Sequence, residues 1–134
     1  MSKEADASLL RIVDANLNRL KEGIRVIEDL FRYLYEDRTL AYELKELRHS
    51  IKLECYKSIT DSRDIEGDIL RTSTNSEKTN KSPKDIVISN FKRAQEASRV
   101  LEEICKSLEV CDSEVFKSVR YTLYSLEKKA FAAF

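Results

Sequence analysis

The chain has 134 residues, of which 36% are charged and 42% are hydrophobic, and it contains only two glycines and one proline. This composition is typical of long amphipathic helices and excludes a sheet protein rich in tight turns, and the length suits a single domain with its own core. Basic and acidic residues are equal in number, 24 of each, so we expect neither nucleic acid nor a membrane surface as a partner.

Two helices are predicted in the first half of the chain. The first, over residues 8–36, has apolar residues at alternating steps of three and four, as one helical face requires. The second, over residues 39–61, follows Asp37 and Thr39, either of which can cap a helix. The apolar positions are Val13, Leu17, Leu20, Ile24, Ile27, Phe31 and Leu34 in the first helix, and Leu40, Leu44, Leu47 and Ile51 in the second.

A polar loop is predicted over residues 62–82, and we expect residues 72–82 to be mobile because they are too polar to fold by burial. A third helix begins near Pro83, with Ser82 as its cap. The fourth helix is capped by Asp112 or Ser113 and reaches nearly to the C-terminus.

The two halves of the chain resemble each other. Each half reads as a helical hairpin, hairpin one over residues 8–61 and hairpin two over residues 83–131. We therefore predict one all-α domain, a four-helix bundle built from duplicated hairpins related by an approximate two-fold axis. Aligning residues 12–28 with 86–102 repeats Ile12, Val13, Asn16, Arg19, Glu22, Arg25, Val26 and Glu28 as Ile86, Val87, Asn90, Arg93, Glu96, Arg99, Val100 and Glu102.

The repeated polar residues have two interpretations. Residues three apart are neighbours on a helix, so the ladder that begins with Asn16 and Arg19 can be an ordinary solvent-exposed run of charge pairs. Alternatively, a two-fold axis brings Arg19 and Arg93 to one cleft, where two guanidinium groups form an anion site. The second interpretation predicts a phosphate ligand.

Acidic residues alternate at Asp64, Glu66 and Asp68 in the loop, around Gly67. This spacing allows several carboxylates to face one Mg²⁺ ion, and the alternative is a solvated acidic turn. His49, the single histidine, is interpreted as a packed or surface residue.

The three cysteines, Cys55, Cys105 and Cys111, have no CxxC spacing, so we expect neither a zinc site nor a disulfide framework. Cys105 lies on an apolar stripe and is interpreted as a small buried residue. No segment resembles a secretory signal or a membrane span, and we expect a cytoplasmic protein.

Five motifs make the chain similar to a known family. Over residues 8–129 it resembles the small helical hydroxymethylpyrimidine phosphate kinases that occur alone or fused ahead of thiamin-phosphate synthase. Ile65 departs from that family's loop, which has threonine there. The motifs are Asp14-Ala15-Asn16-Leu17-Asn18-Arg19, Glu22-Gly23-Ile24-Arg25-Val26-Ile27-Glu28-Asp29, Leu47-Arg48-His49, Arg63-Asp64-Ile65-Glu66-Gly67-Asp68 and Asn90-Phe91-Lys92-Arg93-Ala94-Gln95-Glu96.

The resemblance implies an enzyme of thiamin biosynthesis that transfers phosphate from ATP, with Mg²⁺, to hydroxymethylpyrimidine phosphate. On these motifs we assign roles by residue chemistry. Phosphates are assigned to Arg19, Arg93 and Arg63, substrate contacts to Asn16, Asn90, Glu22, Glu96 and Lys92, and ATP-bound Mg²⁺ to Asp64, Glu66 and Asp68.

An alternative remains open: a non-catalytic helical module that associates with thiamin-phosphate synthase or forms a homo-oligomer. The synthase itself is a (β/α)₈ barrel that needs about 200 residues or more, and no alternation of strands with helices is present in this sequence.

Overall fold

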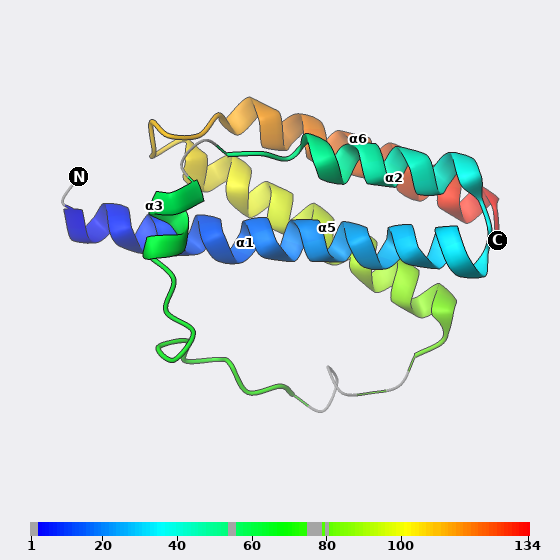
Figure 1. The fold of residues 1–134 in the computed structure, drawn as a ribbon, viewed down its shortest axis with the longest axis horizontal. Coiled ribbons are helices and arrows are strands. Elements are labelled where there is room, and N and C mark those ends of the chain that lie inside the picture. Colours follow the sequence, from blue (N-terminus) through cyan, green and yellow to red (C-terminus); the bar gives the residue numbers. More distant parts are fainter. Residues whose placement is uncertain (1–2, 54–55, 75–78, 80) are drawn as a thin grey trace.

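A computed structural model describes residues 3–53, 56–74, 79 and 81–134, with side chains from residue 6 onward. The described residues fold into α-helices and one π-helical turn, without strands, which confirms the predicted all-α class. Figure 1 shows α1 and α5 crossing in one layer and α2 and α6 lying side by side in the other. The chain therefore forms a two-layer helical bundle.

The first helix is longer than predicted at its start. α1 spans Lys3–Asp29 and continues as a π-helical turn, η1, over Leu30–Leu34. The chain then reverses through Glu36, which has a positive φ of 52°, and Asp37 caps the next helix by accepting a hydrogen bond from the backbone N of Leu40 at 3.1 Å. The turn between the first two helices thus lies close to where the sequence placed it.

The second predicted helix is broken, so the range 39–61 was wrong. α2 spans Arg38–Ser50, residues 51–53 are not helical, and a separate short helix, α3, spans Tyr56–Asp61. The break allows both Ile51 and Ile59 to be buried, at 1% and 0% exposure, because α3 turns across α1 (Figure 1). Burial of Ile59 against α1 favours the bend.

The second hairpin follows the sequence prediction. α5 spans Pro83–Cys105, with Ser82 accepting a hydrogen bond from the backbone N of Asp85 at 3.2 Å. α6 spans Ser113–Ala132 and is capped by Asp112.

Each hairpin is joined by a buried ion pair at matched positions. Glu28, 1% exposed, accepts a hydrogen bond from Nε of Arg48 at 2.8 Å, and Glu102 accepts one from Nη2 of Arg120 at 2.7 Å. A buried carboxylate requires such a partner, so both pairs fix the second helix of a hairpin against the first. The common arrangement is what a duplication would produce, and the duplication itself stays an interpretation.

The cysteines differ from the sequence expectation. Cys105 at the end of α5 and Cys111 before α6 form a disulfide, with Cα atoms 5.4 Å apart. Cys105 is also 3% exposed, as expected of a small buried residue. The expectation for Cys55 lies outside the described residues. The expectation of no disulfide was wrong because the end of α5 and the turn between α5 and α6 bring the two thiols together.

The loop after α3, where it is described, lies on the side of the α1/α5 layer opposite α2 and α6 (Figure 1). Its described part, residues 62–74, is largely exposed and lacks helix. The predicted mobility of residues 72–82 concerns a segment that lies partly outside the described residues. In the part of the chain that is described, none of the helices combines the length and apolar character needed to cross a bilayer.

Candidate functional site: a groove between α1, α5 and the loop

The groove exists because α1 and α5 approach closely at small residues. A Cβ atom added to Gly23 would lie 3.3 Å from the backbone O of Asn90 and 3.5 Å from Cβ of Ala94. α1 and α5 run antiparallel at this crossing (Figure 1), and longer side chains on either side of it line a hollow. Gly23 therefore allows a close backbone approach that a larger side chain would prevent.

The hollow at the crossing, which we call the paired lobe, measures about 730 Å³. Almost every lining residue of α1 has its sequence counterpart on α5, and the loop adds Ser73. This arrangement presents the same chemical groups to a ligand from two sides. The pairs are Asn16 with Asn90, Arg19 with Arg93, Glu22 with Glu96, Gly23 with Ala97 and Val26 with Val100.

The two asparagines of the paired lobe are held in the same way. Nδ2 of Asn16 donates to the carbonyl O of Ile12 at 2.9 Å, and Nδ2 of Asn90 donates to that of Ile86 at 2.8 Å. Both side chains are buried, at 5% and 8% exposure. Because each amide nitrogen is engaged by its own helix, the side-chain oxygen is left to accept from other groups.

The arginines of the paired lobe are available for an anion. Nη1 of Arg19 donates to Oδ1 of Asn16 at 3.4 Å, a long bond that orients the guanidinium without neutralising it. The side chain of Arg93 has no hydrogen bond or ion pair with another residue in the described part of the chain. Glu22 and Glu96 line the same lobe, so the site is dipolar and can take a ligand with both phosphate and amino groups.

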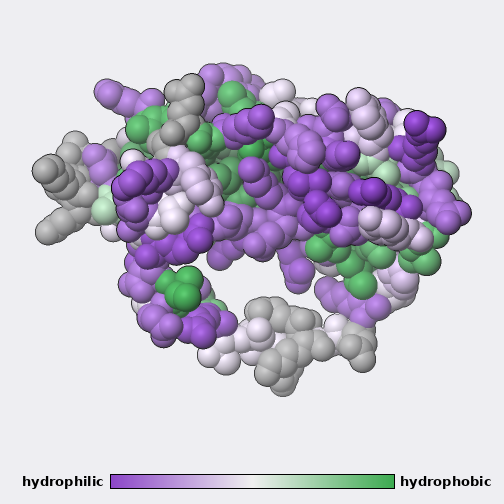
Figure 2. Space-filling model, in the orientation of Figure 1, coloured by the Kyte–Doolittle hydropathy of each residue, from purple (hydrophilic) through white to green (hydrophobic). Residues whose placement is uncertain are grey.

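A second hollow, the loop lobe, continues from the first and measures about 760 Å³. It lies between α1 and residues 63–68, where Figure 2 shows the loop standing away from the helices. Asn16, Arg19 and Val100 line both lobes. Arg19 therefore stands at the border between two adjacent binding volumes.

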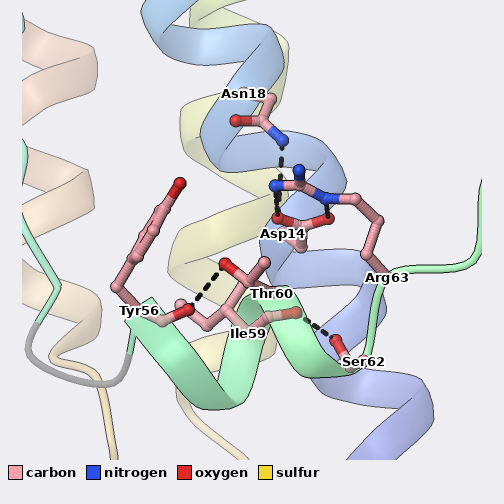
Figure 3. Close-up of polar contacts among 7 residues, drawn as sticks. All are labelled: Asp14, Asn18, Tyr56, Ile59, Thr60, Ser62 and Arg63. Atoms are coloured by element: carbon pink, nitrogen blue, oxygen red, sulfur yellow. Dashed lines mark hydrogen bonds and ion pairs between the residues drawn. The ribbon is translucent and has the colours of Figure 1, made fainter.

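Asp14 clamps the loop to α1. Its carboxylate accepts hydrogen bonds from Nε and Nη2 of Arg63 at 2.8 and 2.7 Å, as Figure 3 shows. Nδ2 of Asn18 also approaches Asp14, at 3.4 Å. The hydrogen bonds to Asp14 raise the pKa of Arg63 above its usual value. α3 brings Arg63 within reach of Asp14. Ile59 of α3 is fully buried, and the chain that follows it lies against α1.

The structure brings together six of the predicted site residues in the paired lobe: Asn16, Asn90, Arg19, Arg93, Glu22 and Glu96. Arg63 lies in the loop lobe, where two of its nitrogens are engaged by Asp14. Lys92 does not line either lobe. Its Nζ lies 3.6 Å from Oε2 of Glu127, in a contact between α5 and α6, and its expected contact with substrate stays a prediction.

The three acidic loop residues do not form the predicted metal cluster. Asp64 accepts from the backbone N of Gly67 at 2.8 Å, and Asp68 accepts from that of Leu70 at 3.0 Å. Glu66 pairs with Arg71 at 3.4 Å. No group of three or more His, Cys, Asp or Glu side chains suited to a metal occurs among the described residues. Asp64 and Asp68 still line the loop lobe.

Sequence reasoning gave no role to Asp14. The available signal was a difference between the halves: Asp14 aligns with the apolar Ile88, so its charge is not part of the repeated ladder. A charged residue that occurs in only one half is a candidate for a contact that only that half makes. Here the contact is with Arg63 of the loop.

Most of the chain matches a known protein family. The ThiD2 family matches residues 11–129. The chain belongs to the ThiD2 family. The match covers α3, the groove and the loop clamp, together with most of all four long helices.

Curated relatives of the chain are named thiamine-phosphate synthase. The protein from Synechocystis sp. is 33% identical over 95% of this chain, and that from Nostoc punctiforme is 37% identical over 87%. A more distant bacterial relative from Rhodopirellula baltica is 31% identical over 93%. This chain spans 34–37% of the length of these three proteins. No solved structure matches the chain at a significant level.

Proposed function

We propose that this protein acts in thiamine biosynthesis, as a kinase that phosphorylates hydroxymethylpyrimidine phosphate to the diphosphate with ATP. Two observations support the proposal. The chain belongs to the ThiD2 family and is related to proteins named thiamine-phosphate synthase. It also has a groove with two adjacent lobes and an arginine at their border, which suits the transfer of a phosphoryl group between two ligands. The second observation carries the proposal.

The proposed reaction needs no strong general base. An oxygen of the pyrimidine's phosphate monoester attacks the γ-phosphorus of ATP, a new P–O bond forms, and the bond to ADP breaks. The second pKa of a phosphate monoester is near 6, so the nucleophile is already largely dianionic at neutral pH. The protein then has to align two polyanions and stabilise the charge on the transferred group.

Each lobe has residues suited to one ligand. In the paired lobe, Glu22 and Glu96 can accept from the amino group of the pyrimidine, while Arg19 and Arg93 hold its phosphate. In the loop lobe, Arg11 and Arg63 face the polyphosphate of ATP. Arg19 borders both lobes, and we therefore assign it to the phosphoryl group during its transfer from ATP to the pyrimidine phosphate.

Magnesium is treated as part of the nucleotide. The described residues gather no cluster of three or more ligands for a protein-held ion, so no step of the reaction is assigned to one. Mg²⁺ bound to ATP would screen the charges of its phosphates, with Asp64 and Asp68 as the carboxylates of the loop lobe.

The test measures ADP release and diphosphate formation by purified protein supplied with ATP, Mg²⁺ and the pyrimidine monophosphate. We expect Arg19→Ala and Arg93→Ala to lower kcat/KM by about 100-fold or more, as loss of a charge-stabilising donor does. Matched controls are Arg25→Ala and Arg99→Ala, whose side chains form exposed pairs with Asp29 and Glu103 outside the groove. All four variants should keep the wild-type melting temperature. Absence of turnover by the wild-type protein would reject the proposal.

A second candidate function has one observation in its favour. In the relatives, the matching region is about a third of a chain named thiamine-phosphate synthase. A non-catalytic module that binds this synthase would explain that relation without chemistry of its own. It predicts no ADP release by the isolated protein and a stable complex with a thiamine-phosphate synthase in sedimentation experiments.

A further inference from the structure

A separate hollow lies on the other flank of α1, beside the end of α2. It measures about 280 Å³ and is lined by Lys21, Arg48, His49 and Lys52, and we call it the cationic hollow. Lys21 directly precedes Glu22 in the chain, but Glu22 faces α5 in the paired lobe whereas Lys21 faces α2. The cationic hollow shares no lining residue with either lobe of the groove.

Most of the positive charge in the cationic hollow is not balanced. Arg48 is paired, because Glu28 accepts from its Nε at 2.8 Å and from its Nη2 at 3.3 Å. The side chains of Lys21, His49 and Lys52 have no hydrogen bond or ion pair with any other residue that the structure describes. Two lysine charges therefore face one small volume in a protein whose formal net charge is zero.

The matching place in hairpin two is filled differently. Arg120 makes the same ion pair, to Glu102 at 2.7 Å, but its guanidinium lies over the rings of Tyr121 and Tyr124 at 5.1 and 5.8 Å. Gln95, the counterpart of Lys21, is 5% exposed and donates to Glu127 at 3.2 Å. In hairpin two, uncharged side chains thus stand at the positions that correspond to Lys21, His49 and Lys52.

This comparison shows that the ion pair of each hairpin needs no additional cations. Arg48 and His49 occupy the last turn of α2, where positive charge also offsets the negative end of the helix dipole. That effect does not explain Lys21, which belongs to α1. Among the described residues, the side chains of Lys21 and Lys52 make no ion pair that would hold hairpin one together, and they line a hollow large enough for a small anion.

We propose that the cationic hollow binds a phosphate group, either free phosphate or the terminal phosphate of a nucleotide. Lysine supplies a compact charge that suits phosphate, and a protonated or neutral histidine can donate a hydrogen bond to it. The volume of about 280 Å³, against about 730 and 760 Å³ for the lobes, fits a phosphate group better than a whole nucleotide. This site is independent of the proposed kinase activity.

His49 makes the test specific, because it is the only histidine in the chain. Its ring proton signals can be followed by NMR at constant pH while inorganic phosphate, ADP or adenosine is added to the full-length protein. We expect a saturable shift with phosphate or with ADP, and none with adenosine. Tighter binding of ADP than of phosphate identifies a nucleotide as the source, and the reverse order identifies the free anion.

Variants separate binding at this site from general screening. Lys21→Gln, which copies the residue of hairpin two, and Lys52→Gln should each weaken the saturable shift by at least about tenfold, or 1.4 kcal/mol. Lys45→Gln is the control on α2, and Arg19→Ala is the control in the groove, and both should keep the wild-type shift. A linear drift that sodium chloride reproduces, or equal binding by Lys21→Gln and wild type, would overturn the proposal. Circular dichroism checks that all variants are folded.

Discussion

Asp14 on α1 accepts hydrogen bonds from two nitrogens of Arg63, at 2.8 and 2.7 Å, across 49 residues of sequence. The side chain of Asp14 is 8% exposed and that of Arg63 is 38% exposed, so the pair is shielded on the helix side and open on the loop side. It is the contact that gives the loop lobe its outer wall. Arg11 adds a weaker tie, from Nη2 to the backbone O of Asp64 at 3.2 Å.

Replacing Asp14 should release the loop without unfolding the bundle. In Asp14→Asn we expect trypsin to cleave after Arg63 and Arg71 several-fold faster than in the wild type, because local opening no longer has to break an ion pair. The KM for ATP should rise while the KM for the pyrimidine phosphate changes little. Asp61→Asn, which removes an exposed pair with Lys57, is the control. Equal cleavage rates in the two variants would show that the clamp does not hold the loop.

Gly23 should tolerate one methyl group but not a larger side chain. In Gly23→Ala, a gain of about 1 kcal/mol in helix propensity opposes the contact at 3.3 Å with the backbone of Asn90, so the melting temperature should stay near that of the wild type. Gly23→Leu should lower the free energy of unfolding by about 2 kcal/mol, because α1 and α5 must separate.

Urea unfolding and calorimetric binding of the pyrimidine phosphate measure both consequences of this separation. Arg25→Leu, on the exposed side of α1, controls for adding leucine to the helix. Gly23→Leu that binds and unfolds like Arg25→Leu would show that the close crossing does not shape the paired lobe.

The sequence predicted the parts of the fold that depend on local periodicity. The stripes of α1, α5 and α6 are long and regular, and the repeat of Asn16 and Arg19 as Asn90 and Arg93 placed four side chains that line one lobe. This succeeded because antiparallel packing of matched helices brings matched residues to their crossing.

Other features depended on contacts that periodicity does not encode. The break after Ser50 arises from burial of Ile59 on α1, and the role of Asp14 arises from a partner 49 residues away. Lys92 directly precedes Arg93 in the chain, yet its position on the helix turns it toward Glu127. The acidic loop residues had a suitable spacing for a metal, but backbone turns use Asp64 and Asp68 locally.

Stability should depend on pH through the carboxylate of Glu102. The hydrogen bond from Arg120 holds the pKa of that carboxyl below its usual range. The contribution of this ion pair to the free energy of unfolding is therefore present above the unfolded-state pKa of the carboxyl, near 4.3. It is lost as the pH falls through the lower folded-state pKa. In Glu102→Gln the urea midpoint should be lower than in wild type at pH 7 and should fall less between about pH 5 and pH 3. Glu109→Gln, an exposed control, should keep the wild-type slope, and an unchanged slope in Glu102→Gln would contradict the assignment.

In the proposed reaction Arg19 and Arg93, contributed by different hairpins, hold the same phosphate. A double-mutant cycle on binding of the pyrimidine phosphate, measured by calorimetry with Arg19→Ala, Arg93→Ala and the double variant, tests it most directly. Because both side chains contact one group, the double variant should bind more tightly than the two single losses predict, with a coupling energy of about 1 kcal/mol or more. Losses that add to within about 0.3 kcal/mol would mean that the arginines act independently, and would contradict the claim.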